Sequence, residues 1–113
     1  PVDGATLFIH YSGFLENGEL FDSSVADVAT AFGKFDQRRF DAKQYIPIPF
    51  EAGRKDGMIP GFIEGIEKMS FGDKAVIFIP SNLAYGAQGA GGVIPPNANI
   101  IFEVELLEAM PQQ

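Results

Sequence analysis

The stretch from Asn82 to Ala98 constrains this chain most, because it can be neither a helix nor a plain core strand. Four of its residues are glycines, which free the backbone, whereas Pro95 and Pro96 stiffen it again and exclude helix. Val93 and Ile94 are apolar although they lie on a loop, where polar residues are usual. Loops held by a rigid scaffold often carry binding residues, so we expect this one to border a binding site.

Alternating apolar residues predict short strands around this loop. Leu7, Ile9 and Tyr11 share one strand face, and the dipeptide Asn17-Gly18 favours a hairpin turn soon afterwards. The predicted extended segments are residues 6–11, 20–23, 46–51 (an edge strand, because it holds two prolines), 73–80 (a buried strand) and 99–108, the last with Ile100, Phe102, Val104 and Leu106 facing inward.

One short helix is predicted at Pro60–Met69. Proline suits the first helical position, and Phe62 and Ile66 lie four residues apart on one apolar face. A helix of this length is unstable alone and has to pack on a sheet. Several antiparallel strands with one short helix give an α+β domain.

Residues 24–47 follow a different pattern. Apolar residues between Val25 and Phe35 have helical spacing, and Ser24 with Asp27 resembles a capping box. We therefore predict an inserted amphipathic helix followed by a basic loop, which holds half of the eight lysines and arginines of the chain. This basic stretch is either a solvated face or a surface that modifies substrate access or contacts an acidic partner.

Composition and net charge limit the classes of function that this chain can have. The 113 residues suit one domain, 1–113, and the net charge of −7 argues against nucleic-acid binding, which needs a basic surface. There is no cysteine, and no apolar run approaches the roughly 18 residues that span a bilayer. The missing cysteines and signal peptide favour a cytoplasmic location, and a start at Pro1 suggests a domain excised or processed from a longer chain.

The chain lacks the residues that most catalytic mechanisms require. His10 is the only histidine and is expected on the sheet surface, which argues against a nucleophilic triad. No His/Cys cluster suggests a metal, and the glycine run lacks the Lys-Ser/Thr that ends a phosphate-binding loop. What remains is the composition of an apolar binding pocket with few polar groups and no cofactor.

Several short motifs follow one another along the chain: Tyr11-Ser12-Gly13, Phe21-Asp22-Ser23-Ser24, Ile59-Pro60-Gly61-Phe62, Ala84-Tyr85-Gly86, Ile94-Pro95-Pro96-Asn97-Ala98 and Phe102-Glu103-Val104-Glu105-Leu106-Leu107. Their order resembles the FKBP-type peptidyl-prolyl cis-trans isomerase domain. The resemblance covers most of the chain outside residues 25–47 and implies a twisted antiparallel sheet of about five strands wrapped around the short helix. It implies X–Pro peptides or unfolded proteins as substrates, macrolides as ligands, and a monomer.

The resemblance also implies roles for individual residues. The catalytic set would be Asp22, Tyr85, Ile59 (through its backbone N–H) and Phe102. The substrate-binding set would be Tyr11, Phe21, Ile48, Phe50, Met58, Phe62, Val93 and Ile94. Three positions depart from the family: Phe62 stands where tryptophan is common, Ile48 where an aromatic is common, and Ala90 where some members have histidine.

Alternatives stay open at this point. Each strand aromatic could be a plain core residue, Asp22 could cap a turn, and the Tyr85 hydroxyl could satisfy backbone groups. The whole domain could be a binding or chaperone module for Pro-containing segments with weak or incidental catalysis, or a purely structural unit of a larger chain.

Overall fold

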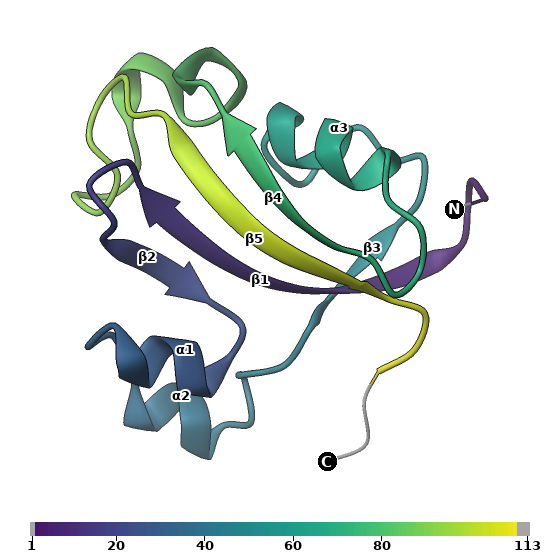
Figure 1. Cartoon of the computed structure of the whole chain (residues 1–113), viewed down its shortest axis with the longest axis horizontal. Helices are drawn as coiled ribbons and strands as arrows, with labels where there is room; N and C mark the ends of the chain where they lie inside the picture. The colour runs from purple at the N-terminus through teal and green to yellow at the C-terminus, as the bar shows by residue number, and fades with distance from the viewer. Residues whose placement is uncertain (1, 111–113) are drawn as a thin grey trace.

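One antiparallel sheet of five strands organises the chain (Figure 1), and the computed structural model describes residues 2–110. The strands pair in the order β2-β1-β5-β4, and β3 also pairs with β1. The elements are β1 (Thr6–Leu15), β2 (Leu20–Ser23), α1 (Ala26–Ala31), α2 (Gln37–Asp41), β3 (Ile48–Glu51), α3 (Pro60–Glu67), β4 (Lys74–Ile79), the 3-10 turns η1 (Ser81–Leu83) and η2 (Gly86–Gln88), and β5 (Ile100–Leu107).

Strand β1 is long enough to hold two partners along one edge. Its second half pairs with β2 through Ser12 and Gly13, and its first half pairs with β3 through residues 6–9. The other edge of β1 pairs with β5. The chain therefore leaves the sheet edge between β2 and β3, and Figure 1 shows α1 and α2 beyond β2 on this excursion.

Helix α3 contributes to the same hydrophobic core as the inner face of the sheet. Ile63 and Ile66 of the helix are buried with Leu7 and Ile9 of β1 and with the inward residues of β5. Gly65 allows the helix to approach β4, because a Cβ there would lie 2.5 Å from Cδ1 of Ile77. The predicted helix, the α+β class and the inward residues of β5 are confirmed, although α3 ends at Glu67.

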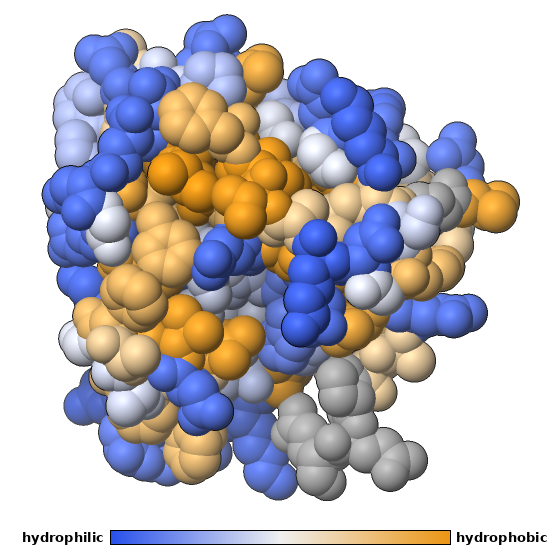
Figure 2. All heavy atoms as spheres, in the orientation of Figure 1, coloured by the Kyte–Doolittle hydropathy of each residue, from blue (hydrophilic) through white to orange (hydrophobic). Residues whose placement is uncertain are grey.

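The prediction of a buried strand at residues 73–80 is wrong. In β4, Val76 is 69% exposed and Phe78 58% exposed, while Ile79 on the other face is buried. Val76 and Phe78 pair with Glu103 and Ile101 of β5 on the face of the sheet opposite the core, so they are exposed although every residue after Lys74 is apolar. Figure 2 shows apolar side chains gathered over the strands, surrounded by hydrophilic ones.

The inserted segment forms two short helices instead of one helix and a basic loop. The expected capping box is also wrong, because the N-cap of α1 is Val25, whose side chain makes no capping hydrogen bond. The Ser24 hydroxyl instead lies 2.8 Å from His10 Nδ1 and accepts a hydrogen bond of 2.8 Å from the Tyr11 backbone N–H. Ser24 thus ties the end of β2 to β1.

Helix α2 has a side-chain cap. The Asp36 carboxylate accepts hydrogen bonds from the backbone N–H groups of Arg38 and Arg39, at 2.9 and 3.2 Å. A cap of this kind satisfies backbone donors that the first helical turn leaves unpaired.

Within residues 2–110, no helix has the length and apolar content needed to cross a membrane.

Candidate active site

A pocket of about 250 Å³ lies where the inner face of the sheet meets the start of α3. Strands β1, β2, β3 and β5, the segment before α3, α3 itself and the loop after β4 all contribute to its wall. The lining residues are Tyr11, Phe21, Asp22, Ile48, Gly57, Met58, Ile59, Phe62, Tyr85 and Phe102.

Phe102 lies at the centre of the aromatic part of this wall. Its ring meets those of Phe62, Phe21 and Tyr11 edge to face, with centroid distances of 5.0, 5.6 and 6.2 Å. Edge-to-face pairs are favourable because the positive ring edge approaches the negative ring face. The rings pack close to the backbone of β1, since a Cβ at Gly13 would lie only 2.8 Å from Cε1 of Phe102. The apolar wall is therefore a packed unit.

Asp22 forms the polar end of the pocket. The Tyr11 hydroxyl donates a hydrogen bond of 2.6 Å to Asp22 Oδ2, and Arg39 Nη1 donates one of 2.7 Å to Oδ1. Burial, together with the hydrogen bond to Asp22 and its charge, raises the pKa of Tyr11 to about 12. Tyr11 is therefore a proton-bearing donor at neutral pH, and Asp22 already has a donor on each oxygen.

Two further donors of the pocket have no partner among residues 2–110. These are the Tyr85 hydroxyl and the backbone N–H of Ile59, the N-cap residue of α3. Burial and, to a lesser extent, the negative charge of Asp22 raise the pKa of Tyr85, so its hydroxyl also keeps its proton. Both residues line the pocket, so each adds an unpaired donor to its wall.

Three of the predicted substrate-binding residues do not line this pocket. Phe50 is 7% exposed and belongs to the core, next to a separate hollow that Leu7 and Ala52 also line. Ile94 is buried in the core as well, and its backbone forms a bridge with Ala90. Val93 is 55% exposed on the loop surface. The pocket thus brings together nine of the twelve predicted site residues.

The sequence did not point to two residues at or beside the pocket. Gly57 lines it without offering a side chain. Arg39 reaches Asp22 from α2, although the sequence presented it only as one of several cations in a basic stretch. Helical spacing around Arg39 could have indicated a helix there, but no local pattern indicates which way that helix faces.

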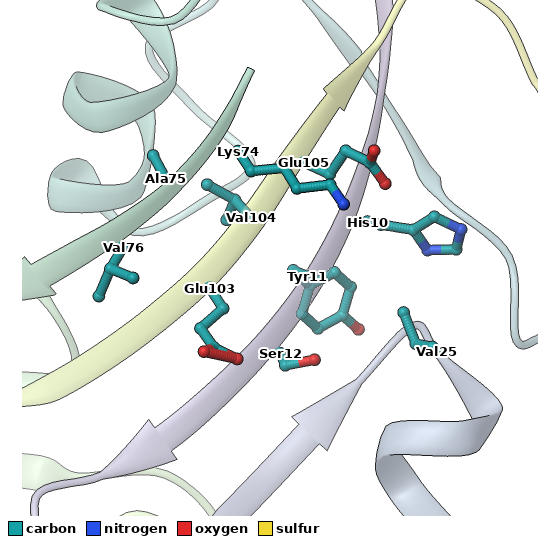
Figure 3. A pocket seen from close by; sticks show the side chains of 10 residues that line it. All are labelled: His10, Tyr11, Ser12, Val25, Lys74, Ala75, Val76, Glu103, Val104 and Glu105. Carbon is teal, nitrogen blue, oxygen red and sulfur yellow. The ribbon is translucent and has the colours of Figure 1, made fainter. Parts of the chain in front are cut away.

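A second hollow, of about 380 Å³, lies on the outer face of the sheet (Figure 3). Lys74, Glu103 and Glu105 line it from β4 and β5, and His10 from β1. Burial lowers the pKa of His10, and the hydroxyl that its ring meets belongs to the fully buried Ser24. That hydroxyl is inaccessible to a substrate, so His10 and Ser24 act as a structural pair.

Comparison with known proteins assigns the chain to a family. The family model described as FKBP-type peptidyl-prolyl cis-trans isomerase matches residues 1–107. An FK506-binding protein of Neisseria meningitidis serogroup A is 43% identical over 107 residues, covering 95% of this chain and 82% of that protein. FK506-binding protein 2 of Yarrowia lipolytica is 42% identical, covering 92% of this chain and 60% of that protein.

A solved structure agrees. The crystal structure of a peptidyl-prolyl cis-trans isomerase from Pseudomonas syringae pv. tomato is similar with a TM-score of 0.66 and 29% sequence identity. The match covers 99% of this chain and 66% of that chain. The chain therefore belongs to the FKBP-type peptidyl-prolyl cis-trans isomerase family.

Proposed function

We propose that this domain catalyses rotation about X–Pro peptide bonds in the pocket around Phe102, and that it thereby assists protein folding. One observation carries the proposal: a cavity walled by packed aromatic rings also borders two donors without partners among residues 2–110, the Tyr85 hydroxyl and the Ile59 N–H. Such a site combines an apolar interior with the means to hold peptide carbonyls.

The reaction needs no nucleophile and no proton transfer. Rotation about a peptide bond has a barrier of roughly 18–20 kcal/mol because it breaks amide resonance. Both isomers of X–Pro are close in energy, but they exchange in tens to hundreds of seconds. The planar amide is more dipolar than the twisted one, so an apolar cavity favours the twisted form relative to water. Binding the twisted form more tightly than the ground state is catalysis.

Residue roles follow from this scheme. The proline ring of the substrate would contact Phe62 and Phe102, with Phe21, Ile48 and Met58 closing the sides. Tyr85 and the Ile59 N–H would donate to the carbonyls that flank the twisting bond. Asp22 and Tyr11, joined by their hydrogen bond, would form the polar rim of the cavity.

The other predicted residues would act less directly. Phe50 and Ile94 would support the wall from the core, and Val93 on the exposed loop would contact the peptide beyond the proline. Macrolides of the FK506 type, which give several relatives their name, would occupy the same cavity and compete with peptides.

Kinetic assays on short peptides test the proposal. The cis-to-trans exchange rate of a series of X–Pro peptides, measured by NMR exchange or by protease coupling, should rise in proportion to the concentration of the domain. Added FK506 should abolish the acceleration. Exchange rates equal to those in buffer at micromolar protein would refute the proposal.

A second candidate is a binding or chaperone module that uses the insertion. Phe32, Phe35 and Phe40 of this segment are 48%, 38% and 52% exposed, and exposed apolar groups can hold unfolded chains. Phe32→Ser should then weaken suppression of aggregation of a denatured client while leaving peptide isomerisation unchanged. Equal loss of both activities would speak against a separate client surface.

A further inference from the structure

Arg39 links the inserted segment to the pocket. It lies on α2, seventeen residues after Asp22, and its Nη1 donates to Asp22 Oδ1 at 2.7 Å. The Arg39 and Asp22 side chains are 27% and 40% exposed. By comparison, the Lys34–Glu19 pair is 45% and 51% exposed, and the Arg54–Asp56 pair 56% and 76%. Exposed ion pairs contribute little to stability. The Arg39–Asp22 pair is less exposed than these two pairs, so its interaction is less screened by solvent.

The guanidinium of Arg39 is held from its other side. Its Cζ lies 4.6 Å from the centroid of the Tyr45 ring, in cation–π geometry. Tyr45 stacks on Phe35 with a centroid distance of 5.6 Å and an interplanar angle of 12°. The Tyr45 hydroxyl accepts a hydrogen bond of 2.9 Å from the backbone N–H of Asp36, which also caps α2. Arg39 is thus built into the folded insertion.

Each Asp22 oxygen therefore accepts one hydrogen bond, Oδ2 from Tyr11 and Oδ1 from Arg39. Arg39 does not line the cavity itself. Tyr85 lines the same cavity as Asp22 and experiences its charge. Without the guanidinium, Asp22 would have a free acceptor oxygen at the edge of an apolar pocket. That oxygen would attract water or capture the Tyr85 hydroxyl, and either event would weaken the hold on the substrate carbonyl.

We propose that Arg39 is a positioning residue for isomerisation: by occupying Asp22 Oδ1 it keeps the carboxylate turned to Tyr11 and leaves the Tyr85 hydroxyl free for substrate. The inserted segment is then part of the active site, and its folding governs the polar end of the pocket. This inference rests on the proposed isomerase function.

A double-mutant cycle tests it. Arg39→Ala should lower kcat/KM about tenfold, since hydrogen bonds to charged groups contribute roughly 1.5–3 kcal/mol and each 1.4 kcal/mol is a factor of ten. In the Asp22→Ala background, Arg39→Ala should change kcat/KM by less than about twofold, because its target is gone. Arg39→Lys should recover part of the loss, and Arg39→Gln little of it, because only lysine keeps the charge.

Arg38→Ala is the matched control. Arg38 is a neighbouring arginine on α2 that makes no ion pair among residues 2–110, so its removal should leave kcat/KM unchanged. Tyr45→Leu should reduce activity in the same direction as Arg39→Ala, and this effect too should vanish in the Asp22→Ala background. Urea unfolding of each variant separates loss of folded protein from loss of function.

The outcomes are distinguishable. The inference would be overturned if Arg39→Ala kept the wild-type kcat/KM. It would also be overturned if the double variant lost kcat/KM by the product of the two single losses. Either result would leave the proposed function intact. A wild-type domain without isomerase activity would overturn both.

Discussion

Phe62 of α3 and Phe102 of β5 meet edge to face with their ring centroids 5.0 Å apart, and both rings are almost fully buried. The pair joins the helix to the sheet at the base of the pocket. Packing of the core and the proposed binding of substrate therefore involve the same two side chains, and substitutions there have to be chosen so that the two can be measured separately.

Phe102→Leu is expected to reduce both stability and activity. Leucine keeps most of the apolar volume, and such swaps usually cost less than about 1.5 kcal/mol, whereas each lost edge-to-face pair removes about 0.5–1.5 kcal/mol of specific ring contact. We expect the free energy of unfolding to fall by about 1–3 kcal/mol and kcat/KM to fall at least tenfold. Urea unfolding and peptide kinetics measure the two effects.

Phe71→Leu provides the control for Phe102→Leu. Phe71 is 40% exposed and does not line the pocket, so both quantities should stay near their wild-type values. Full activity in Phe102→Leu would mean that the central ring is only a packing residue.

Tyr85→Phe should lower activity without lowering stability. The Tyr85 hydroxyl has no hydrogen-bond partner in the described part of the chain, so folding loses nothing when it is removed. A hydrogen bond made only to the substrate contributes about 0.5–1.5 kcal/mol, which predicts a two- to tenfold drop in kcat/KM at an unchanged urea midpoint. A lower midpoint with normal kinetics would show a structural hydroxyl instead.

Gly61→Ala should destabilise the fold by about 1–3 kcal/mol, the range for forcing an extra carbon into a packed core. The new Cβ would overlap Cγ2 of the buried Ile79 and lie 3.2 Å from the backbone oxygen of Leu83. Differential scanning calorimetry or urea unfolding measures the loss. Glu64→Ala on the exposed side of α3 should stay within about 0.5 kcal/mol of the wild type.

Stability should decline at alkaline pH because of Tyr11. Its pKa is raised from 10.0 to about 12 in the folded state, so between these values the unfolded chain releases the phenol proton while the folded chain holds it. The contribution of Tyr11 is fully present below pH 10 and is lost as the pH rises through about 12. Urea unfolding across this range should show a shallower decline in Tyr11→Phe. Equal declines would contradict the raised pKa.

Local periodicity explains what could be predicted of the fold. In β1 and β5 apolar and polar residues alternate, so the sequence itself marks the face that is buried. In β4 nearly every residue is apolar, and the pattern cannot tell a strand that is buried on both faces from one that is buried on one face. The exposure of Val76 and Phe78 depends on which face of the sheet packs against the core, which only the packing of distant segments determines.

The candidate site divides in the same way. Its aromatic members could be named through the family resemblance that the ordered motifs carry, because the residues of each motif are neighbours in the chain. Phe50 could not be separated from the pocket wall, since its side chain faces the core through the register of β3 on β1. Arg39 could not be connected with Asp22, because the contact depends on how α1 and α2 fold back over the sheet edge.

By itself, the sequence determined the strand faces of β1 and β5, the helix α3, the absence of thiol chemistry, and the set of aromatic residues available for a pocket. The tertiary structure decided which of those rings meet, which face of β4 is left bare, and that Asp22 has a donor on each oxygen. The physical reason is range: periodicity and turn chemistry act over a few residues, whereas a shared cavity or an ion pair requires segments that only the folded sheet brings together.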